Sequence, residues 1–239
     1  MKPTATKELP RHIAIVMDGN RRWARAHFLP SLEGHRRGVK AVRRTIEACL
    51  EFEVPILTLY TFSSENWNRS KEEVSALMGL LALHLRKEMD ELVSEGVRFK
   101  ALGRISELPE NIQVLVRDLE EQTKDNTKLF FNIALNYGGR QELVDASRQL
   151  AQKVLDGELK PEDIDEEIFA KHLTTAGQAD PDLWIRTGGD HRVSNFLLWQ
   201  LAYSEMVFLP IYWPEFNATY LRQAIDEFGE RERRFGASK

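Results

Sequence analysis

The stretch IAIVMDGNRRWA, residues 13–24, decides how the chain folds and where its site lies. Its first five residues form an apolar run that predicts a buried strand. Asn20 is a favourable N-cap for a helix over residues 21–27. Asp18 therefore stands between a strand and a helix, at the kind of crevice where open α/β sheets bind ligands.

Three arginines, Arg21, Arg22 and Arg25, crowd the start of that predicted helix, where the helix dipole disfavours cations. A local rule broken in this way is frequent at functional sites. The simplest ligand is a diphosphate on the backbone N–H groups of the helix start, with the Asp18 carboxylate holding a metal ion beside it. The alternative is a capped turn with solvated arginines, and this stretch alone does not decide between the two.

The composition excludes several classes of protein. Of the 239 residues, 42% are hydrophobic, which suffices for one large domain or two small ones. The net charge of −4 gives no bulk attraction to nucleic acid, and a single cysteine, Cys49, allows no intramolecular disulfide. Residues 1–10 lack the apolar core of a signal peptide, and the apolar stretch 76–85 is far shorter than the roughly 20 residues that cross a bilayer. We therefore expect a cytoplasmic protein with a flexible N-terminus over residues 1–10.

Apolar runs typical of strands alternate with helical patterns along the chain, and no linker separates two domains. This alternation predicts one α/β domain over residues 1–239, with a mostly parallel sheet and helices on both of its faces. The predicted strands are residues 13–17, 56–62, 97–102, 129–135, 183–187 and 206–209.

Two predicted helices, over residues 34–51 and 71–95, carry long apolar stripes. In the second helix the small residues Ala76, Gly79 and Ala82 are spaced three apart. Such a stripe either packs closely against a neighbouring helix or leaves room for the wall of an apolar tunnel, and close packing is the commoner case.

The strand over residues 56–62 ends in a polar loop, SSENWNR, residues 63–69. Ser70 and Glu73 follow it and predict a capping box for the helix over 71–95. Asn66 and Trp67 have no such local duty, so they are candidates to contact a phosphate and an allylic chain. The alternative for Trp67 is a hydrogen-bonded position in the core.

A third strand end, RTGGDHRVS at residues 186–194, combines two glycines with two arginines. The glycines allow the backbone to approach a ligand, and the Arg186 and Arg192 guanidinium groups match phosphate oxygens in pairs. Ser194 is placed to cap a predicted helix over residues 195–203. Glu205, just past that helix, is a second candidate carboxylate for a metal ion, although a solvated surface position is the more frequent fate of such a residue. Together these three strand ends and the apolar helices predict a ligand with an anionic head and an apolar tail.

Several long motifs occur in an order that resembles the cis-prenyltransferases, over about residues 11–236. They are MDGNRRWA (17–24), GH (34–35), TFSSENWNR (61–69), NYGGR (136–140), IRTGGDHRVSNFLLWQLAYSE (185–205) and RRFG (233–236).

The resemblance implies a six-stranded sheet surrounded by about seven helices, with an elongated hydrophobic tunnel and a Mg²⁺-dependent homodimer. Its members condense an allylic diphosphate, usually farnesyl diphosphate, with successive molecules of isopentenyl diphosphate, and each new double bond is cis. The bacterial members that this chain resembles most make undecaprenyl diphosphate, the precursor of the lipid carrier for cell-wall polysaccharides. Residues 228–239 are implied to contribute to the dimer and to the partner's active site. At most peripheral contact with the inner face of the membrane is expected, for product release.

The resemblance also implies roles for individual residues. Asp18 holds Mg²⁺ and helps to move the diphosphate, and Glu205 adds to the metal environment. Three acceptors for the proton that is lost stay open, namely Asp18, Asn66 through a water molecule, and a diphosphate oxygen. The residues implied to bind the allylic diphosphate are Gly19, Asn20, Arg22 and Arg69, with backbone groups from Gly19 through Arg21 to Trp23 assisting. Those implied to bind isopentenyl diphosphate are Arg186, Arg192 and Ser194. Those implied to line or order the pocket are His35, Phe62, Ser63, Glu65, Asn66, Trp67 and Glu73. Arg234 and Gly236 match the element that reaches the partner subunit.

The sequence departs from the family pattern at Ser31, where many members carry an arginine that also contacts the allylic diphosphate. Arg21, at a position that varies in the family, or Arg25 is a candidate to replace it.

Three other functions fit the sequence less well. A phosphatase with Asp18 as nucleophile needs an aspartate two residues on, where this chain has Asn20. A trans-type prenyl synthase needs DDxxD motifs, which the chain lacks. An inactive accessory subunit is expected to lack the metal carboxylate or the arginine pair, and both are present.

Overall fold

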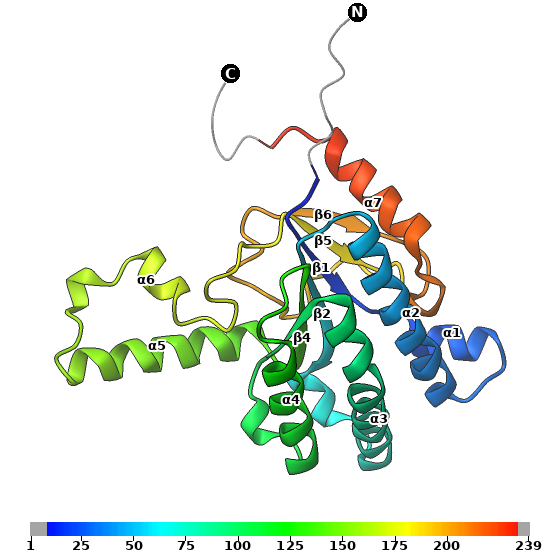
Figure 1. The fold of residues 1–239 in the computed structure, drawn as a ribbon, viewed down its shortest axis with the longest axis horizontal. Helices are drawn as coiled ribbons and strands as arrows, with labels where there is room; N and C mark the ends of the chain where they lie inside the picture. Colours follow the sequence, from blue (N-terminus) through cyan, green and yellow to red (C-terminus); the bar gives the residue numbers. More distant parts are fainter. Residues whose placement is uncertain (1–8, 234–239) are drawn as a thin grey trace, which may run out of the picture.

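The computed structural model describes residues 9–233, which form a six-stranded parallel sheet with the order β3-β4-β2-β1-β5-β6 (Figure 1). Every described strand pair is parallel, as the alternating pattern predicted. The strands are β1 (His12–Val16), β2 (Ile56–Ser63), β3 (Val97–Leu102), β4 (Leu129–Tyr137), β5 (Leu183–Arg186) and β6 (Glu205–Phe208).

The connections contain α-helices and four short 3₁₀ helices within the described part of the chain. The α-helices are α1 (Asn20–Ala26), α2 (Ser31–Glu51), α3 (Lys71–Glu95), α4 (Glu110–Thr123), α5 (Gly139–Leu155), α6 (Glu166–Ala170) and α7 (Ala218–Glu230). The 3₁₀ helices are η1 (Ser64–Asn68), η2 (Ile105–Glu107), η3 (Pro161–Asp163) and η4 (Trp213–Glu215). In Figure 1, α5 and α6 project from the body on the left, and α1 lies at the right-hand edge.

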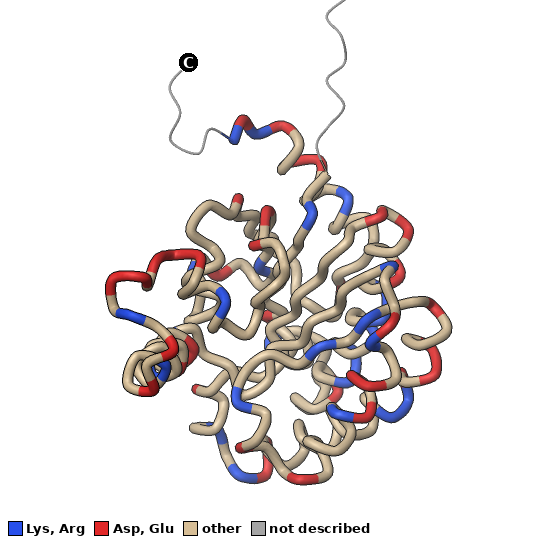
Figure 2. Tube along the Cα trace, turned by 60° about the vertical axis from the view of Figure 1, so that its left-hand side comes forward, with Lys and Arg blue, Asp and Glu red and all other residues tan. Residues whose placement is uncertain are grey.

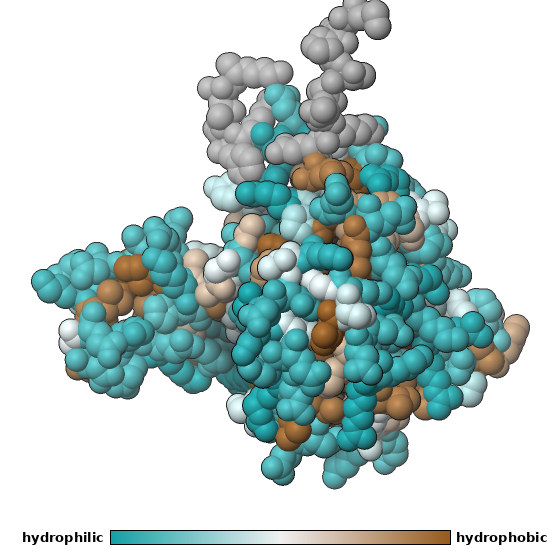
Figure 3. Space-filling view, in the orientation of Figure 1, coloured by the Kyte–Doolittle hydropathy of each residue, from teal (hydrophilic) through white to brown (hydrophobic). Residues whose placement is uncertain are grey.

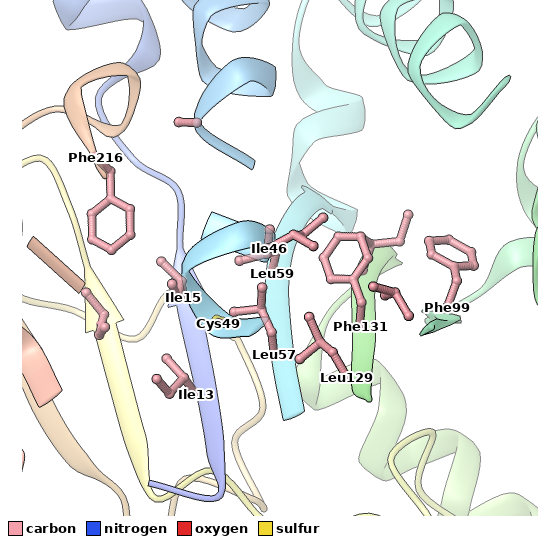
Figure 4. Packing of buried hydrophobic residues seen from close by; sticks show 14 of the residues in the cluster. Ile13, Ile15, Ile46, Cys49, Leu57, Leu59, Phe99, Leu129, Phe131 and Phe216 are labelled. Atoms are coloured by element: carbon pink, nitrogen blue, oxygen red, sulfur yellow. The ribbon is translucent and has the colours of Figure 1, made fainter. Parts of the chain in front are cut away.

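The core lies between one face of the sheet and the helices α2, α3, α4 and α7. Side chains alternate along each strand, so every second residue points to this face. Figure 4 shows how the strand residues meet the α2 residues Ile46 and Cys49. The strand residues that it labels are Ile13, Ile15, Leu57, Leu59, Phe99, Leu129 and Phe131.

The opposite face of the sheet packs against residues 193–204, which form turns instead of the predicted helix over 195–203. Ser194, Asn195 and Leu197 have φ angles of 53°, 61° and 46°, in the left-handed region, so a right-handed helix cannot pass through them. Phe196 and Leu197 are fully buried there. The prediction that Ser194 caps a helix is therefore wrong.

Two helix starts also differ from the predictions. The helix α1 begins at Asn20 itself, with Gly19 as its N-cap at φ 102°, so the assignment of Asn20 as the N-cap is wrong by one residue. A Cβ atom on Gly19 would lie 2.7 Å from a ring carbon of Tyr212, which is why this turn takes glycine. The helix α2 begins at Ser31, three residues before the predicted start. No described helix is long and apolar enough to cross a membrane.

His12 gives a prediction for acid stability. Its ring is fully buried in β1, with Nδ1 2.6 Å from the Ala179 carbonyl oxygen and Nε2 2.7 Å from the Thr58 hydroxyl. Burial lowers the pKa of His12 to about 4, against 6.5 for a free histidine. Because the folded pKa is depressed, the stabilisation is complete above pH 6.5 and is lost as the pH falls towards 4. We expect the loss to reach about 3 kcal/mol in the free energy of unfolding.

Urea unfolding of the wild type and of His12→Gln between neutral pH and pH 4 measures this loss. Glutamine has no titrating group, so the free energy of H12Q is expected to depend less steeply on pH. An equally steep dependence in both proteins would remove His12 as its source.

Candidate active site

Two polar pockets and an apolar cavity meet at the carboxyl end of β1. The larger polar pocket has a volume of about 830 Å³ and the smaller about 570 Å³, and the apolar cavity measures about 160 Å³. Met17, Asn20 and His35 line all three. Asp18 lines both polar pockets. This arrangement follows from the parallel sheet, in which the carboxyl ends of the neighbouring strands β2, β1 and β5 all lie on the same side.

The Asp18 carboxylate is held by two arginines from different elements. Its Oδ2 atom lies 2.7 Å from Nη2 of Arg186, and its Oδ1 atom lies 3.0 Å from Nη2 of Arg22. Oδ1 also accepts a hydrogen bond of 2.6 Å from the N–H of Gly19. Asp18 and Arg186, from two of the strand ends singled out in the sequence, thus meet directly, and Arg22 joins them, whereas Arg192 pairs with Asp190.

Arg22 crosses from α1 to the Gly-Gly turn after β5. It donates to the carbonyl oxygen of Gly188 at 2.8 Å and to Asp190 at 2.9 Å. Asp190 also pairs with Arg192 at 2.9 Å. Burial alone would raise the pKa of Asp190. The hydrogen bond from Arg192 and the charge of Arg22 outweigh burial and hold this pKa below its usual value. Arg22 therefore connects the start of α1 with the turn after β5 through hydrogen bonds and an ion pair.

The larger polar pocket concentrates positive charge. Figure 2 shows basic and acidic residues interspersed along the trace, so this concentration is a local feature. The pocket is lined by the five arginines Arg21, Arg22, Arg25, Arg69 and Arg192, together with Asp18, Gly19, Ser31 and Asp190. Arg21 and Arg25 do line the pocket near Ser31, as their proposed compensating role requires.

The smaller polar pocket lies between the ends of β2 and β5. Arg186 is almost fully buried and donates to the Ser194 hydroxyl at 2.7 Å and to the carbonyl oxygen of Arg192. Ser63, Glu65, Asn66, Arg69, Arg186, Ser194 and Asn195 line this pocket. Arg192, which the sequence grouped with Arg186 and Ser194, lines the larger pocket instead, together with its ion-pair partner Asp190.

His35 lies at the junction of the three spaces. Burial, and then the nearby charge of Arg69, lower the pKa of His35 to about 4, so its ring is neutral at pH 7. Its Nε2 atom is buried without a hydrogen-bond partner among the described residues. A neutral imidazole with one free nitrogen can donate to or accept from a ligand, but it does not add a positive charge.

The apolar cavity runs between α2, α3 and the sheet. The α3 residues that line it are Leu77, Met78, Leu80, Leu81, His84, Leu85, Glu88 and Leu92. The small-residue stripe of α3 does not line it, since Gly79 is exposed with open space around its Cα and neither Ala76 nor Ala82 faces the cavity. The tunnel-wall reading of that stripe is therefore wrong, and larger side chains form the wall.

Asn66 and Trp67 have the local partners that the sequence did not indicate. Asn66 caps η1 by accepting a hydrogen bond from the N–H of Ser63 at 3.2 Å. The Trp67 indole donates to Asn136 at 2.7 Å and packs edge-on against Phe62, which lines the apolar cavity. The view that Asn66 and Trp67 lack a local duty is wrong.

Glu73 and Trp23 stand beside the pockets rather than in them. Ser70 caps α3 by accepting from the N–H of Glu73 at 3.2 Å, which is the Ser70 half of the predicted capping box; the reciprocal bond from the Ser70 N–H to the Glu73 side chain is not formed. The Glu73 carboxylate itself binds Arg69 at 3.0 Å and lies 3.8 Å from Arg21. The Trp23 ring stacks on His27.

Glu205 does not meet Asp18 within one chain. It pairs in register with Leu183 at the start of β5, and Leu183 pairs with Ile13, whereas Asp18 lies beyond the other end of β1. Glu205 binds Arg231 at 2.8 Å instead. The prediction that Asp18 and Glu205 share one metal environment is wrong for a single chain, because parallel strands hold the two at opposite edges of the sheet. Arg234 and Gly236 lie outside the described residues.

The residues present fit a magnesium ion that arrives with a diphosphate. No cluster of three or more His, Cys, Asp or Glu side chains that could hold a metal ion occurs in residues 9–233. Mg²⁺ is commonly held by one or two carboxylates and completes its shell with phosphate oxygens and water. A diphosphate that takes over the hydrogen bonds of Arg22 and Arg186 would release the Asp18 oxygens for the ion.

Several site residues could not be found from the sequence. The buried Thr187 hydroxyl donates to the carbonyl oxygen of Asp18 at 2.8 Å, and Asp190 joins two arginines. Both lie in the RTGGDHRVS stretch, where their place beside Arg186 and Arg192 was the one signal that could have pointed to them, although it does not reveal their partners. Tyr212 and Trp213 reach Gly19 and Asp18 from η4 and its N-cap, nearly two hundred residues away, with no motif to mark them.

Comparisons with known proteins agree with this geometry. A prenyltransferase family model, described as "Putative undecaprenyl diphosphate synthase", matches residues 16–236. The chain belongs to this family. A ditrans,polycis-undecaprenyl-diphosphate synthase ((2E,6E)-farnesyl-diphosphate specific) of Pseudomonas aeruginosa is 47% identical over 95% of this chain and 91% of its own length. An isoprenyl transferase of Porphyromonas gingivalis is 49% identical over 95% of this chain and 90% of its own.

Two solved structures share the fold. Lavandulyl diphosphate synthase from Lavandula x intermedia, in complex with dimethylallyl diphosphate, superposes with a TM-score of 0.93 at 39% identity, over 96% of this chain and 99% of that one. A "probable undecaprenyl diphosphate synthase" from Campylobacter jejuni gives a TM-score of 0.80 at 33% identity over the same shares. The predicted fold class and family are confirmed, and the chain is a prenyltransferase.

Proposed function

We propose that this enzyme extends farnesyl diphosphate with successive molecules of isopentenyl diphosphate, in cis, to undecaprenyl diphosphate. The observation that carries the proposal is the junction at Met17, Asn20 and His35, where two arginine-lined pockets open beside one apolar cavity. Two diphosphate substrates need two anionic subsites, and a growing hydrocarbon needs an apolar one. Several relatives are named as undecaprenyl-diphosphate synthases specific for (2E,6E)-farnesyl diphosphate, which supports the same allylic substrate and product for this chain.

In this proposal the larger polar pocket takes the allylic diphosphate. It offers the guanidinium groups of Arg22 and Arg69, with Arg21 and Arg25 near Ser31. The N–H of Gly19 already donates to the Asp18 carboxylate, and the N–H of Trp23 donates to the carbonyl oxygen of Gly19. Arginine side chains therefore supply most of the hydrogen bonds to the diphosphate. The smaller pocket, with Arg186 and Ser194, takes isopentenyl diphosphate.

The reaction breaks the allylic C–O bond, and its electron pair leaves with the diphosphate. The arginines stabilise the charge that develops on the leaving group, because they are already oriented by Asp18, Asp190 and the Gly188 carbonyl oxygen. The alkene of isopentenyl diphosphate forms a C–C bond to the allylic carbon, and the resulting cation loses a proton to a water molecule as its double bond forms. Mg²⁺, held by Asp18, supplies further neutralisation of diphosphate charge when bound. Asn66 is an amide whose oxygen already accepts from Ser63, so it serves through a water molecule rather than as a base.

The homodimer, the magnesium requirement and peripheral contact with the membrane belong to the same proposal. Glu205 could reach a metal site only across a subunit interface, since it lies at the start of β6, at the opposite end of the strands from Asp18.

Purified protein with Mg²⁺, farnesyl diphosphate and labelled isopentenyl diphosphate tests the function, with products sized after dephosphorylation. We expect many additions per allylic primer and a main product of the undecaprenyl length. Release of phosphate without consumption of isopentenyl diphosphate would indicate a phosphatase, and no turnover by the protein alone would indicate an accessory subunit.

A further inference from the structure

The loop between α1 and α2 presents apolar side chains to solvent. Phe28 is 97% exposed and Leu29 is 40% exposed, with Pro30 exposed beside them. The loop projects at the right-hand edge of the body in Figure 1, and apolar side chains reach the surface at the same edge in Figure 3. Single exposed apolar residues are common, but three exposed in succession form a contiguous apolar tip, which is typical of a surface that contacts a partner or a membrane.

The backbone makes Phe28 still less expected. The end of α1 forms a Schellman motif, in which the N–H of Leu29 donates to Ala24 at 2.8 Å and the N–H of Phe28 donates to Arg25 at 3.2 Å. The residue at the Phe28 position of this motif is left-handed and is usually glycine, and here φ is 55°. A bulky residue in this conformation is strained. Both folding and solubility would favour glycine, so the phenyl ring is kept against local preference.

Positive charge surrounds this loop. Residues 20–40 contain six basic residues and one acidic residue, Glu33, in a chain whose net charge is −4. Arg25, Arg36 and Arg37 are exposed on the two helices that flank the loop. Glu33 lies 3.7 Å from Arg36 and 3.5 Å from Arg37, so it offsets only part of their charge.

The loop is also the rim of the larger polar pocket. Leu29, Pro30 and Ser31 line that pocket together with Arg21 and Arg25. A surface that binds the tip of the loop therefore lies next to the mouth of the proposed diphosphate subsite.

We propose that Phe28 and Leu29 insert into the interface of a bilayer that contains anionic phospholipids, while the flanking arginines contact its headgroups. The apolar tip of the loop suits the acyl region of a bilayer, and the arginines around it suit the anionic headgroups that cover that region. Insertion would place the pocket rim against the bilayer, where a long-chain diphosphate product can leave. This inference deepens the membrane contact of the proposed function and assigns it to one loop, and the binding itself can be measured without turnover.

Flotation with vesicles tests this proposal without turnover. The probes are vesicles of phosphatidylglycerol and phosphatidylcholine in equal parts, and vesicles of phosphatidylcholine alone. We expect the full-length wild type to prefer the anionic vesicles, and Phe28→Gly to bind them about tenfold more weakly, since one buried phenyl ring is lost. Glycine relieves the strained position, so the melting temperature of F28G is expected to be unchanged or raised, and weaker binding cannot be ascribed to unfolding.

Two further variants complete the experiment. Leu155 is 81% exposed at the end of α5, so Leu155→Ser removes a comparable exposed apolar group elsewhere and is expected to bind vesicles like the wild type. Replacing Arg36 and Arg37 by glutamine is expected to weaken binding to the anionic vesicles only. Turnover of F28G on soluble substrates in detergent is expected to stay within about twofold, which separates this proposal from the proposed function.

Three results would overturn the inference. One is equal vesicle binding by F28G and the wild type. Another is wild-type binding that ignores the anionic lipid or does not occur. The third is a change of oligomeric state in F28G by light scattering without any vesicle binding, which would assign Phe28 to a protein interface.

Discussion

Replacing Asp18 by asparagine is expected to lower kcat by about a thousandfold or more, with little change in KM for farnesyl diphosphate. The carboxylate is shared by the two polar pockets and is the group that fits Mg²⁺ there. Arg22 and Arg186 remain in D18N, and they keep the attraction for the two diphosphates. The loss therefore falls on the chemical step rather than on binding.

D18N keeps the fold because the amide oxygen can still accept from Arg186, whose side chain is 4% exposed and would otherwise lose a partner. Steady-state kinetics with each substrate varied in turn, and thermal unfolding of the same preparations, check both statements. Asp190→Asn is the matched control, since Asp190 pairs with Arg22 at 2.9 Å but lines only the larger pocket. It is expected to raise KM and to change kcat by less than about tenfold. A kcat of D18N within tenfold of the wild type would contradict the metal role.

The sheet could be predicted because buried parallel strands are continuous apolar runs. The runs around Ile13, Leu57 and Leu183 pair in register in the structure, and their polar successors meet at one edge. The Asp18 and Arg186 contact follows from this topology, since β1 and β5 are neighbours.

The segment after Ser194 could not be predicted from periodicity. Its apolar residues recur at a helix-like spacing, yet they pack through a chain of turns. A buried carboxylate, Glu142, organises this region by accepting a hydrogen bond from Gln200 at 3.1 Å and one from the N–H of Thr174 at 3.0 Å. Such long-range polar contacts leave no local pattern, so helix periodicity was misleading here.

Glu205 and Gly79 were misplaced for two different reasons. Glu205 ends the long motif over residues 185–205, which suggested a place beside Asp18. Its pairing with Leu183 shows instead that Glu205 begins β6, at the amino ends of the strands and away from Asp18. Gly79 belongs to a stripe whose direction depends on how α3 rolls against α2, and α3 presents Leu81 and Leu85 to the cavity instead. When apolar residues occur on several sides of a helix, as in α3, the sequence does not determine which side faces the cavity.

Replacing Leu81 by tryptophan is expected to shorten the products by several isoprene units, with the first condensation little affected. Leu81 lines the apolar cavity on α3 and neither of the polar pockets. The cavity measures about 160 Å³, below the roughly 300 Å³ at which ligand pockets usually begin, so a growing chain has to displace its walls. An added indole resists that displacement, since overpacking an apolar space costs about 1–3 kcal/mol. Sizing of the dephosphorylated products, with the initial rate of isopentenyl diphosphate consumption, measures both parts of this expectation.

Leu83→Trp is the matched control, because Leu83 lies two residues further along the same helix and is 61% exposed. L83W adds the same side chain to α3 without entering the cavity, so its product lengths are expected to equal those of the wild type. If L81W and L83W give the same distribution as the wild type, the cavity does not hold the growing chain. If L81W abolishes the first condensation as well, Leu81 acts on the junction at His35 rather than on chain length.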